Sequence, residues 1–123
     1  MSTNDRATTV LVLEDEVIVG MDIAMSLEEA GFSVQGPFKS AEKAKIAAEE
    51  TLPAFAVLDL NLGNNQTSEE VAWLLSEKNC PFIFLTGYEA SSHPVIRKFG
   101  HAECFSKPVN LDAITKKIRS VVG

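Results

Sequence analysis

The chain has 123 residues, of which 46% are hydrophobic and 23% charged, so it suits one globular domain and is neither disordered nor collagen-like. Eleven Lys and Arg against 17 Asp and Glu give a net charge of −6, which argues against direct binding to nucleic acid. The apolar runs are too short to cross a membrane, and residues 1–9 lack the apolar core of a signal peptide. Because Cys80 and Cys104 show no metal-ligand spacing and form no framework of bridges, we expect a reducing, cytoplasmic setting.

Short apolar runs alternate with helical patterns along the chain, which predicts parallel βαβ units. The predicted strands span residues 8–13, 32–34, 54–58, 82–85 and 102–105. The pair Gly36–Pro37 is expected to end the second strand, because both residues favour turns. Five strands alternating with about five helices indicate an open, doubly wound parallel sheet.

The helices are predicted from their caps and from their apolar periodicity. The first helix stops at Gly31, Ser40 caps the second and Asn110 caps the last. Thr67 and Glu70 have capping-box spacing at the start of the third helix. Residues 88–100 contain only a short apolar patch, so we expect the fourth helix to be short or poorly ordered.

Polar residues follow the predicted strands where a doubly wound sheet binds its ligands. Glu14 and Asp15 follow the first strand, Asp59 the third, Thr86 the fourth and Lys107 the fifth. Three converging carboxylates repel one another unless a cation lies between them, and oxygen ligands favour Mg²⁺. A hydroxyl and an ammonium across the same pocket suit an oxyanion such as phosphate. Taken alone, Asp59 is explained as a turn residue or helix cap and Glu14 and Asp15 as an acidic helix start, and Thr86 and Lys107 singly indicate nothing, but the five together indicate a functional site.

Four segments, in this order, resemble the receiver domain of bacterial two-component response regulators. They are VLVLEDE (10–16), VLDLNLG (57–63), FLTGY (84–88) and FSKPV (105–109). The resemblance covers nearly the whole chain and implies a flavodoxin-like fold with strand order 2-1-3-4-5. It also implies a receiver domain at residues 8–122, preceded by a flexible N-terminus at residues 1–7.

The resemblance assigns a role to each site residue. Asp59 would accept a phosphoryl group from the phosphohistidine of a histidine kinase, Lys107 would pair with the phosphoryl oxygens, and Thr86 would move to hydrogen-bond one of them. The Mg²⁺ ion would be held by the set Glu14, Asp15, Asp59 and Asn61, the last through its backbone carbonyl. The Lys107–Pro108 bond is typically cis in this family. Such a domain is not an enzyme, although it assists its own phosphoryl transfer and slow autodephosphorylation.

Two features depart from the usual receiver pattern. Cys104 stands where most receivers carry an aromatic switch residue, and Tyr88 is either its substitute or a surface aromatic of the loop. Tyr88 and Asn61 occupy positions that tune the lifetime of the acyl phosphate in this family. The segment PFIFLTGY (81–88) resembles the PFxFATGY signature of the FAT GUY subfamily and departs from it at Leu85. Members of that subfamily are often stand-alone receivers linked to HWE-type histidine kinases.

We therefore expect a single-domain response regulator that switches a partner-binding surface, relays phosphate or drains it from a kinase. By family analogy, the fourth helix, the fifth strand and the last helix would form the surface that binds a downstream protein or phosphotransfer partner. The alternative is a receiver-shaped protein-binding scaffold that works without phosphorylation. A flavin-binding domain is disfavoured by the acidic turn after the first strand, and a phosphatase by Asn61 where a second Asp is needed.

Three further residues receive structural interpretations from the sequence. Trp73 is expected to pack rather than to bind, His101 to be a surface histidine, and Cys104 to be a small buried residue. No helix shows an apolar stripe that stands out as exposed, so the oligomeric state is left open.

Overall fold

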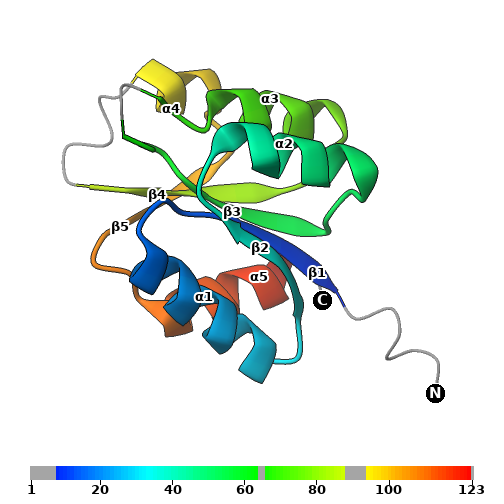
Figure 1. The fold of residues 1–123 in the computed structure, drawn as a ribbon, viewed down its shortest axis with the longest axis vertical. Coiled ribbons are helices and arrows are strands. Elements are labelled where there is room, and N and C mark those ends of the chain that lie inside the picture. Colours follow the sequence, from blue (N-terminus) through cyan, green and yellow to red (C-terminus); the bar gives the residue numbers. More distant parts are fainter. Residues whose placement is uncertain (1–7, 64–65, 88–93, 123) are drawn as a thin grey trace.

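The computed structural model describes residues 8–63, 66–87 and 94–122. Five parallel strands form one sheet in the order β2-β1-β3-β4-β5, as the resemblance implied (Figure 1). The strands are β1 (Thr9–Leu13), β2 (Ser33–Phe38), β3 (Phe55–Asp59), β4 (Phe82–Thr86) and β5 (Glu103–Ser106). The predicted α/β class and the doubly wound topology are therefore confirmed.

Within the described residues, five helices cover the two faces of this sheet (Figure 1). They are α1 (Val17–Glu29), α2 (Ala41–Glu50), α3 (Glu69–Glu77), α4 (Pro94–Lys98) and α5 (Leu111–Val122). Helices α1 and α5 lie on one face, and α2, α3 and α4 lie on the other (Figure 1). Helix α4 has only five residues, so the prediction of a short fourth helix is confirmed. None of the helices in the described part of the chain is both long and apolar enough to span a bilayer.

The core forms two layers because side chains alternate between the faces of each strand. In β1, Leu11 and Leu13 pack with the α2–α3–α4 side, whereas Val10 and Val12 pack with the α1–α5 side. All residues of β3 and β4 are buried, as expected of central strands that are covered on both faces. This continuous burial explains why their sequences read as apolar runs and why polar groups gather only at the strand ends.

The predicted end of β2 is wrong. The strand continues through Gly36–Pro37 to Phe38, and its register against β1 shifts between Leu11 and Leu13. Gly36 has a φ of +101°, and Pro37 offers no backbone N–H to the sheet. A glycine with positive φ and a proline are both compatible with an irregular edge strand, so the pair bends β2 instead of ending it.

The predicted helix caps are confirmed with one exception. The Ser40 hydroxyl accepts a hydrogen bond from Lys43 N at 3.3 Å, and Asn110 Oδ1 accepts one from Ala113 N at 3.0 Å. The capping box at Thr67 is wrong, because Ser68 is the N-cap of α3 and makes no side-chain cap hydrogen bond. Thr67 Oγ1 instead accepts from Glu69 N at 3.3 Å, one residue short of the capping-box partner.

Replacing Gly36 should destabilise the fold. A Cβ atom there would lie 2.6 Å from Phe38 N and 2.8 Å from Val12 O, in addition to the strain of the positive φ. We expect Gly36→Ala to lower the free energy of unfolding by about 2 kcal/mol or more, measured by urea denaturation. Gly100→Ala is the matched control, because a Cβ at that position meets nothing within 4 Å. Equal stability of the two variants would contradict this account of β2.

Candidate functional site

The parallel strands bring all five predicted site residues to one edge of the sheet. Asp59 and Thr86 are the last residues of β3 and β4. Glu14 and Asp15 follow β1 directly, and Lys107 follows β5. Backbone hydrogen bonds fix these ends, because Glu14 N donates to Phe38 O at 2.8 Å and Lys107 N donates to Thr86 O at 2.7 Å. Residues 93 positions apart in the chain thus become neighbours at this edge.

Three carboxylates form a compact cluster at this edge. One oxygen from each of Glu14, Asp15 and Asp59 lies within 4.8 Å of the others. Glu14 and Asp59 are almost fully buried, and Asp15 is half-buried. The buried Glu14 Oε1 lies 3.2 Å from the Lys107 ammonium. A compact set of carboxylate oxygens is the environment that a hard divalent cation such as Mg²⁺ requires, so these residues fit that ion.

The Lys107 ammonium neutralises part of this negative charge. Its Nζ donates to Asp59 Oδ2 at 3.2 Å, to Glu14 Oε2 at 3.3 Å and to Glu16 Oε1 at 3.1 Å. Burial of the ammonium lowers the pKa of Lys107, but the hydrogen bond with Glu16 and the charges of Asp59 and Glu14 together raise it above its usual value. Lys107 is therefore a fixed cation at the centre of the acidic residues.

The surroundings of Asp59 disfavour its charged form. Desolvation, followed by the hydrogen bond and negative charge of Glu14 and a hydrogen bond with Asp15, raises the pKa of Asp59 from 3.8 to about 8. The charge of Lys107 lowers this pKa but is outweighed. Without a divalent ion, the raised pKa favours the protonated form of the Asp59 carboxyl at neutral pH, whereas a bound divalent ion would favour the carboxylate.

The Thr86 hydroxyl lies at the end of β4 without a hydrogen-bond partner among the described residues. Thr86 is 1% exposed, and its Oγ1 is buried. A buried hydroxyl that makes no hydrogen bond costs about 1–3 kcal/mol, so the position favours a ligand or a rearrangement that supplies an acceptor or donor. Such a position suits the switch role that the resemblance implied.

The remaining predicted residues are placed as follows. Asn61 lies two residues beyond Asp59 and forms an antiparallel bridge with Thr67, and the Lys107–Pro108 bond is cis as expected. Cys104 is half-buried and packs on the α2–α3–α4 side of the core, so the prediction of a buried residue is only partly correct. The role predicted for Tyr88 lies outside the described residues.

Sequence reasoning missed the contribution of Glu16. Its side chain is 61% exposed, yet its carboxylate lies 3.1 Å from Lys107 Nζ and shares that ammonium with Asp59 and Glu14. The sequence shows only a third acidic residue in the run from Glu14 to Glu16, which a solvated helix start explains equally well. Only the position of Lys107 in space distinguishes the two interpretations.

An exposed apolar stripe on α1 was also missed. The exposed fractions are 52% for Val17, 75% for Ile18, 53% for Met21 and 55% for Met25. A cavity of about 450 Å³ lies beside this helix and is lined by Glu16 and Lys107 among others. The helix presents apolar side chains on both its inner and outer surfaces, so periodicity alone did not separate the exposed set.

Two aromatic residues also differ from expectation in detail. Trp73 packs against Phe99 with ring centroids 4.6 Å apart, as expected, but its side chain remains 46% exposed. His101 is exposed, as predicted, and its ring also lies 5.7 Å from that of Phe82. Both residues belong to an aromatic cluster centred on Phe99 rather than to the carboxylate site.

No family model matches the chain. It is 34% identical over 86 residues to the phyllosphere-induced regulator PhyR of Methylorubrum extorquens, over 68% of this chain and 32% of PhyR. It is 28% identical over 109 residues to the photosynthetic apparatus regulatory protein RegA of Cereibacter sphaeroides, over 87% of this chain and 59% of RegA. The chain thus spans about a third of PhyR and three fifths of RegA.

Solved structures of receiver domains and related regulators also match this chain. The signal receiver domain of a modulated diguanylate cyclase from Desulfovibrio desulfuricans matches with a TM-score of 0.80 and 26% identity, over 94% of both chains. SdrG from Sphingomonas melonis matches with a TM-score of 0.78 and 26% identity, over 95% of this chain and 98% of SdrG. The chain is therefore homologous to these response regulators and has the fold of their receiver domain.

Proposed function

We propose that the chain is a phosphoacceptor receiver in which Asp59 takes a phosphoryl group from a histidine kinase. The observation that carries this proposal is the environment of Asp59, a buried carboxyl between two further carboxylates and the Lys107 ammonium at 3.2 Å. A scaffold that works without phosphorylation would gain nothing from this arrangement, since burying mutually repelling carboxylates lowers the stability of the fold.

In the proposed reaction, an Asp59 carboxylate oxygen attacks the phosphorus of a phosphohistidine. The phosphorus–nitrogen bond breaks, an acyl phosphate forms, and the histidine nitrogen leaves with the bonding pair and takes up a proton. Mg²⁺ held by Glu14, Asp15 and Asp59 would supply positive charge against the incoming phosphate. Phosphoryl transfer depends mainly on positioning and charge neutralisation, which is what these side chains provide.

Lys107 and Thr86 would respond to the product. The acyl phosphate brings new anionic oxygens to Asp59, so the Lys107 ammonium gains a partner that competes with its resting carboxylates. The buried Thr86 hydroxyl gains an acceptor that it lacks among the described residues. Contacts that exist in only one of the two states can shift a conformational equilibrium, which would serve an activator, a relay or a phosphate sink.

The proposed phosphorylation of Asp59 can be tested directly with a small phosphodonor. Incubation with Mg²⁺ and acetyl phosphate should add one phosphoryl group to the protein, detected by intact mass, because the ion and Lys107 neutralise the charge around Asp59. The Asp59→Asn variant should gain none, and chelation of the metal should abolish the gain in the wild type.

Asp22→Asn is a matched control, since Asp22 is an exposed carboxylate on α1 outside the cluster of Glu14, Asp15 and Asp59. It should be phosphorylated as the wild type is. If neither acetyl phosphate nor an autophosphorylated histidine kinase modified the wild type, the phosphorylation-independent scaffold would be the better interpretation.

The raised pKa of Asp59 predicts that Mg²⁺ affinity depends on pH. Between about pH 6 and about pH 7, Mg²⁺ affinity should rise nearly tenfold, because a proton must leave the carboxyl when the ion binds, and the rise should be smaller between about pH 7 and about pH 8. Above about pH 8 the carboxyl is ionised without metal, so the affinity should level off. Calorimetry in buffers of different ionisation enthalpy should show close to one proton released per ion at pH 7, and much less in Asp59→Asn. A flat pH profile in the wild type would contradict the assignment.

We further propose that the apolar stripe of α1 is the surface on which the kinase docks. The stripe consists of Val17, Ile18, Met21 and Met25. Helix α1 begins two residues after Asp15, a proposed metal ligand, so a protein held on this stripe would have its phosphohistidine close to Asp59. Exposed apolar side chains gathered on one helix next to a functional site are typical of protein-binding surfaces. An HWE-type kinase, as the FAT GUY resemblance implies, is the partner we propose.

A charged side chain in this stripe should separate docking from chemistry. Ile18→Glu should slow phosphoryl transfer from a cognate autophosphorylated kinase at least about tenfold, since a buried apolar contact is replaced by a carboxylate. Phosphorylation by acetyl phosphate should be unchanged. Ile46→Glu is the matched control, because Ile46 on α2 is also exposed, at 48%, but lies on the other face of the sheet. Equal slowing with both donors would show damage to the site rather than loss of docking.

A further inference from the structure

A groove runs between α2 and α3, on the face of the sheet opposite the α1 stripe (Figure 1). It consists of two cavities of about 470 and 360 Å³ that share Glu70 and Trp73 in their linings. The charged and aromatic residues along it are Glu42, Lys45 and Glu49 from α2 and Glu69, Glu70, Trp73 and Glu77 from α3. We call this surface the α2–α3 groove.

The groove carries carboxylates that the protein does not neutralise. Among the described residues, no Lys or Arg forms an ion pair with four of its five glutamates, namely Glu42, Glu49, Glu70 and Glu77. The groove contributes a single ammonium, that of Lys45. By contrast, Glu69 at the end of the groove is paired with Lys98 at 2.7 Å.

Helix stability explains only half of these carboxylates. Glu42 and Glu70 lie in the first turns of their helices, where the helix dipole favours negative charge. Glu49 and Glu77 lie in the last turns, where the dipole disfavours it, and neither helix has a basic residue in its last turn. The dipole therefore does not account for the negative charge at the far end of the groove, where Lys45 and the α3 C-cap residue Lys78 are the neighbouring cations, and a cationic ligand would compensate this charge further.

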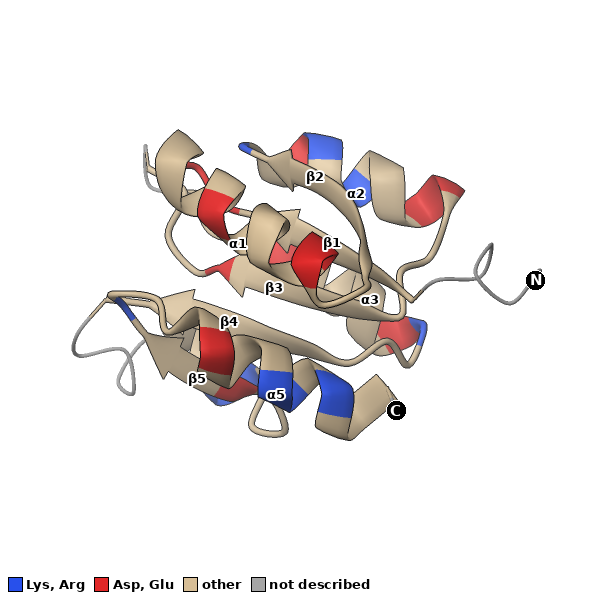
Figure 2. Cartoon of the chain, turned by 90° about the horizontal axis from the view of Figure 1, so that it is seen from below, with Lys and Arg blue, Asp and Glu red and all other residues tan. Residues whose placement is uncertain are grey.

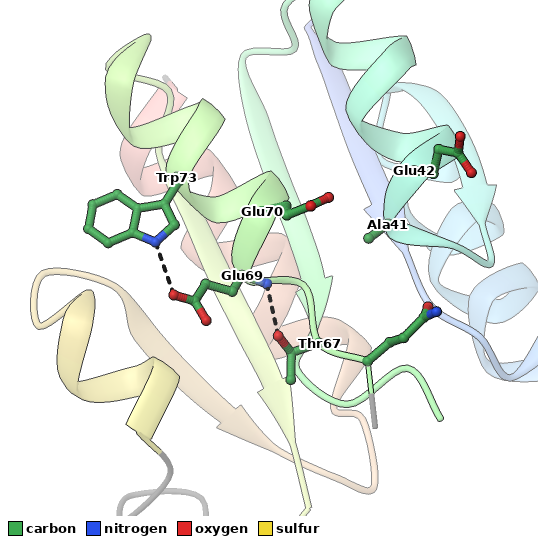
Figure 3. Close-up of a pocket in the computed structure, with 7 residues that line it drawn as sticks. Ala41, Glu42, Thr67, Glu69, Glu70 and Trp73 are labelled. Atoms are coloured by element: carbon green, nitrogen blue, oxygen red, sulfur yellow. Dashed lines mark hydrogen bonds between the residues drawn. The ribbon is translucent and has the colours of Figure 1, made fainter. Parts of the chain in front are cut away.

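Trp73 adds a fixed aromatic surface at the rim of the groove. Its Nε1 donates to Glu69 Oε2 at 3.1 Å and its ring packs against Phe99, although 46% of the side chain is exposed. Figure 3 shows this hydrogen bond on one side of α3, with Glu70 projecting toward α2. An indole held in this way can stack with a ligand without losing further rotamer freedom.

From this combination we infer that the α2–α3 groove binds an arginine-bearing segment of a partner protein. A guanidinium pairs with a carboxylate through two parallel hydrogen bonds and also stacks on indole, which an ammonium does less well. Glu70 and Glu77 are seven residues apart, about 10 Å along a helix axis. An extended segment covers that distance in three residues, so arginines at every third position match the spacing.

This inference does not depend on phosphorylation, so it is tested on the unphosphorylated protein. Trp73 is the only tryptophan of the chain, and its fluorescence reports directly on the groove. An amidated peptide with arginine at every third position and alanine between should change this fluorescence saturably, with a dissociation constant that rises with salt. The same peptide with citrulline, the neutral isostere of arginine, should bind at least about tenfold more weakly.

Matched variants locate the binding. The double variant Glu70→Gln, Glu77→Gln should bind the arginine peptide at least about tenfold more weakly, whereas Glu28→Gln on α1 should bind it as the wild type does. Circular dichroism shows whether each variant keeps its fold. The inference is overturned if the arginine peptide gives no saturable change, if citrulline binds equally well, or if Glu28→Gln weakens binding as much as the double variant.

A second copy of the chain is the competing occupant. Basic residues also lie on α5, where Figure 2 shows them as blue bands, so one molecule could place its α5 in the groove of another. Light scattering over a range of protein concentrations distinguishes the two. A monomer throughout the range supports a separate partner, and self-association that the double variant abolishes would assign the groove to a second copy and overturn the inference.

Discussion

The contact between the Lys107 ammonium and its surrounding carboxylates is the interaction on which this edge of the sheet depends. Glu14 and Asp59 are buried, and among the described residues Lys107 is the positive side chain that pairs with both of them, so it is what opposes their repulsion when both are ionised. The strand order explains how the contact arises. Because β1 and β3 are neighbours, their ends bring the acids together, and β5, two strands away from β3, brings the ammonium across the end of β4. Charge and topology therefore have to be right together.

The sheet also separates the surfaces that a signalling protein would use. The carboxylate site lies at the strand ends, the apolar stripe lies on α1, and the α2–α3 groove lies on the opposite face (Figure 1). A protein bound on one face therefore leaves the other accessible. Helix α4 is linked to the groove side through the Lys98–Glu69 ion pair and the packing of Phe99 on Trp73. A shift of α4 would then change the rim of the groove before it reached α1.

The sequence predicted best where strong local patterns coincide with global constraints. Apolar runs that end in acids placed β1 and β3, and with them Glu14, Asp15 and Asp59, at one edge. The sequence predicted less well where the same residues are compatible with two local structures. Gly36–Pro37 can end a strand or bend it, and only pairing with β1 selects the second possibility. The exposure of Ile18 depends on how α1 packs, and the role of Glu16 depends on where Lys107 reaches, so neither is contained in the local sequence.

The exposed position of Glu16 has a consequence for how the resting site is held. Two of the three carboxylates on Lys107 are shielded from solvent, whereas Glu16 reaches the ammonium from the solvent side. Ions in the surrounding solution weaken exposed pairs far more than buried ones. The ionic environment would therefore loosen one contact of Lys107 and leave the other two nearly intact. At higher salt the lysine would remain at the site, but its ammonium would reorient more easily. The ionic strength around the protein would therefore influence how easily Lys107 changes partners.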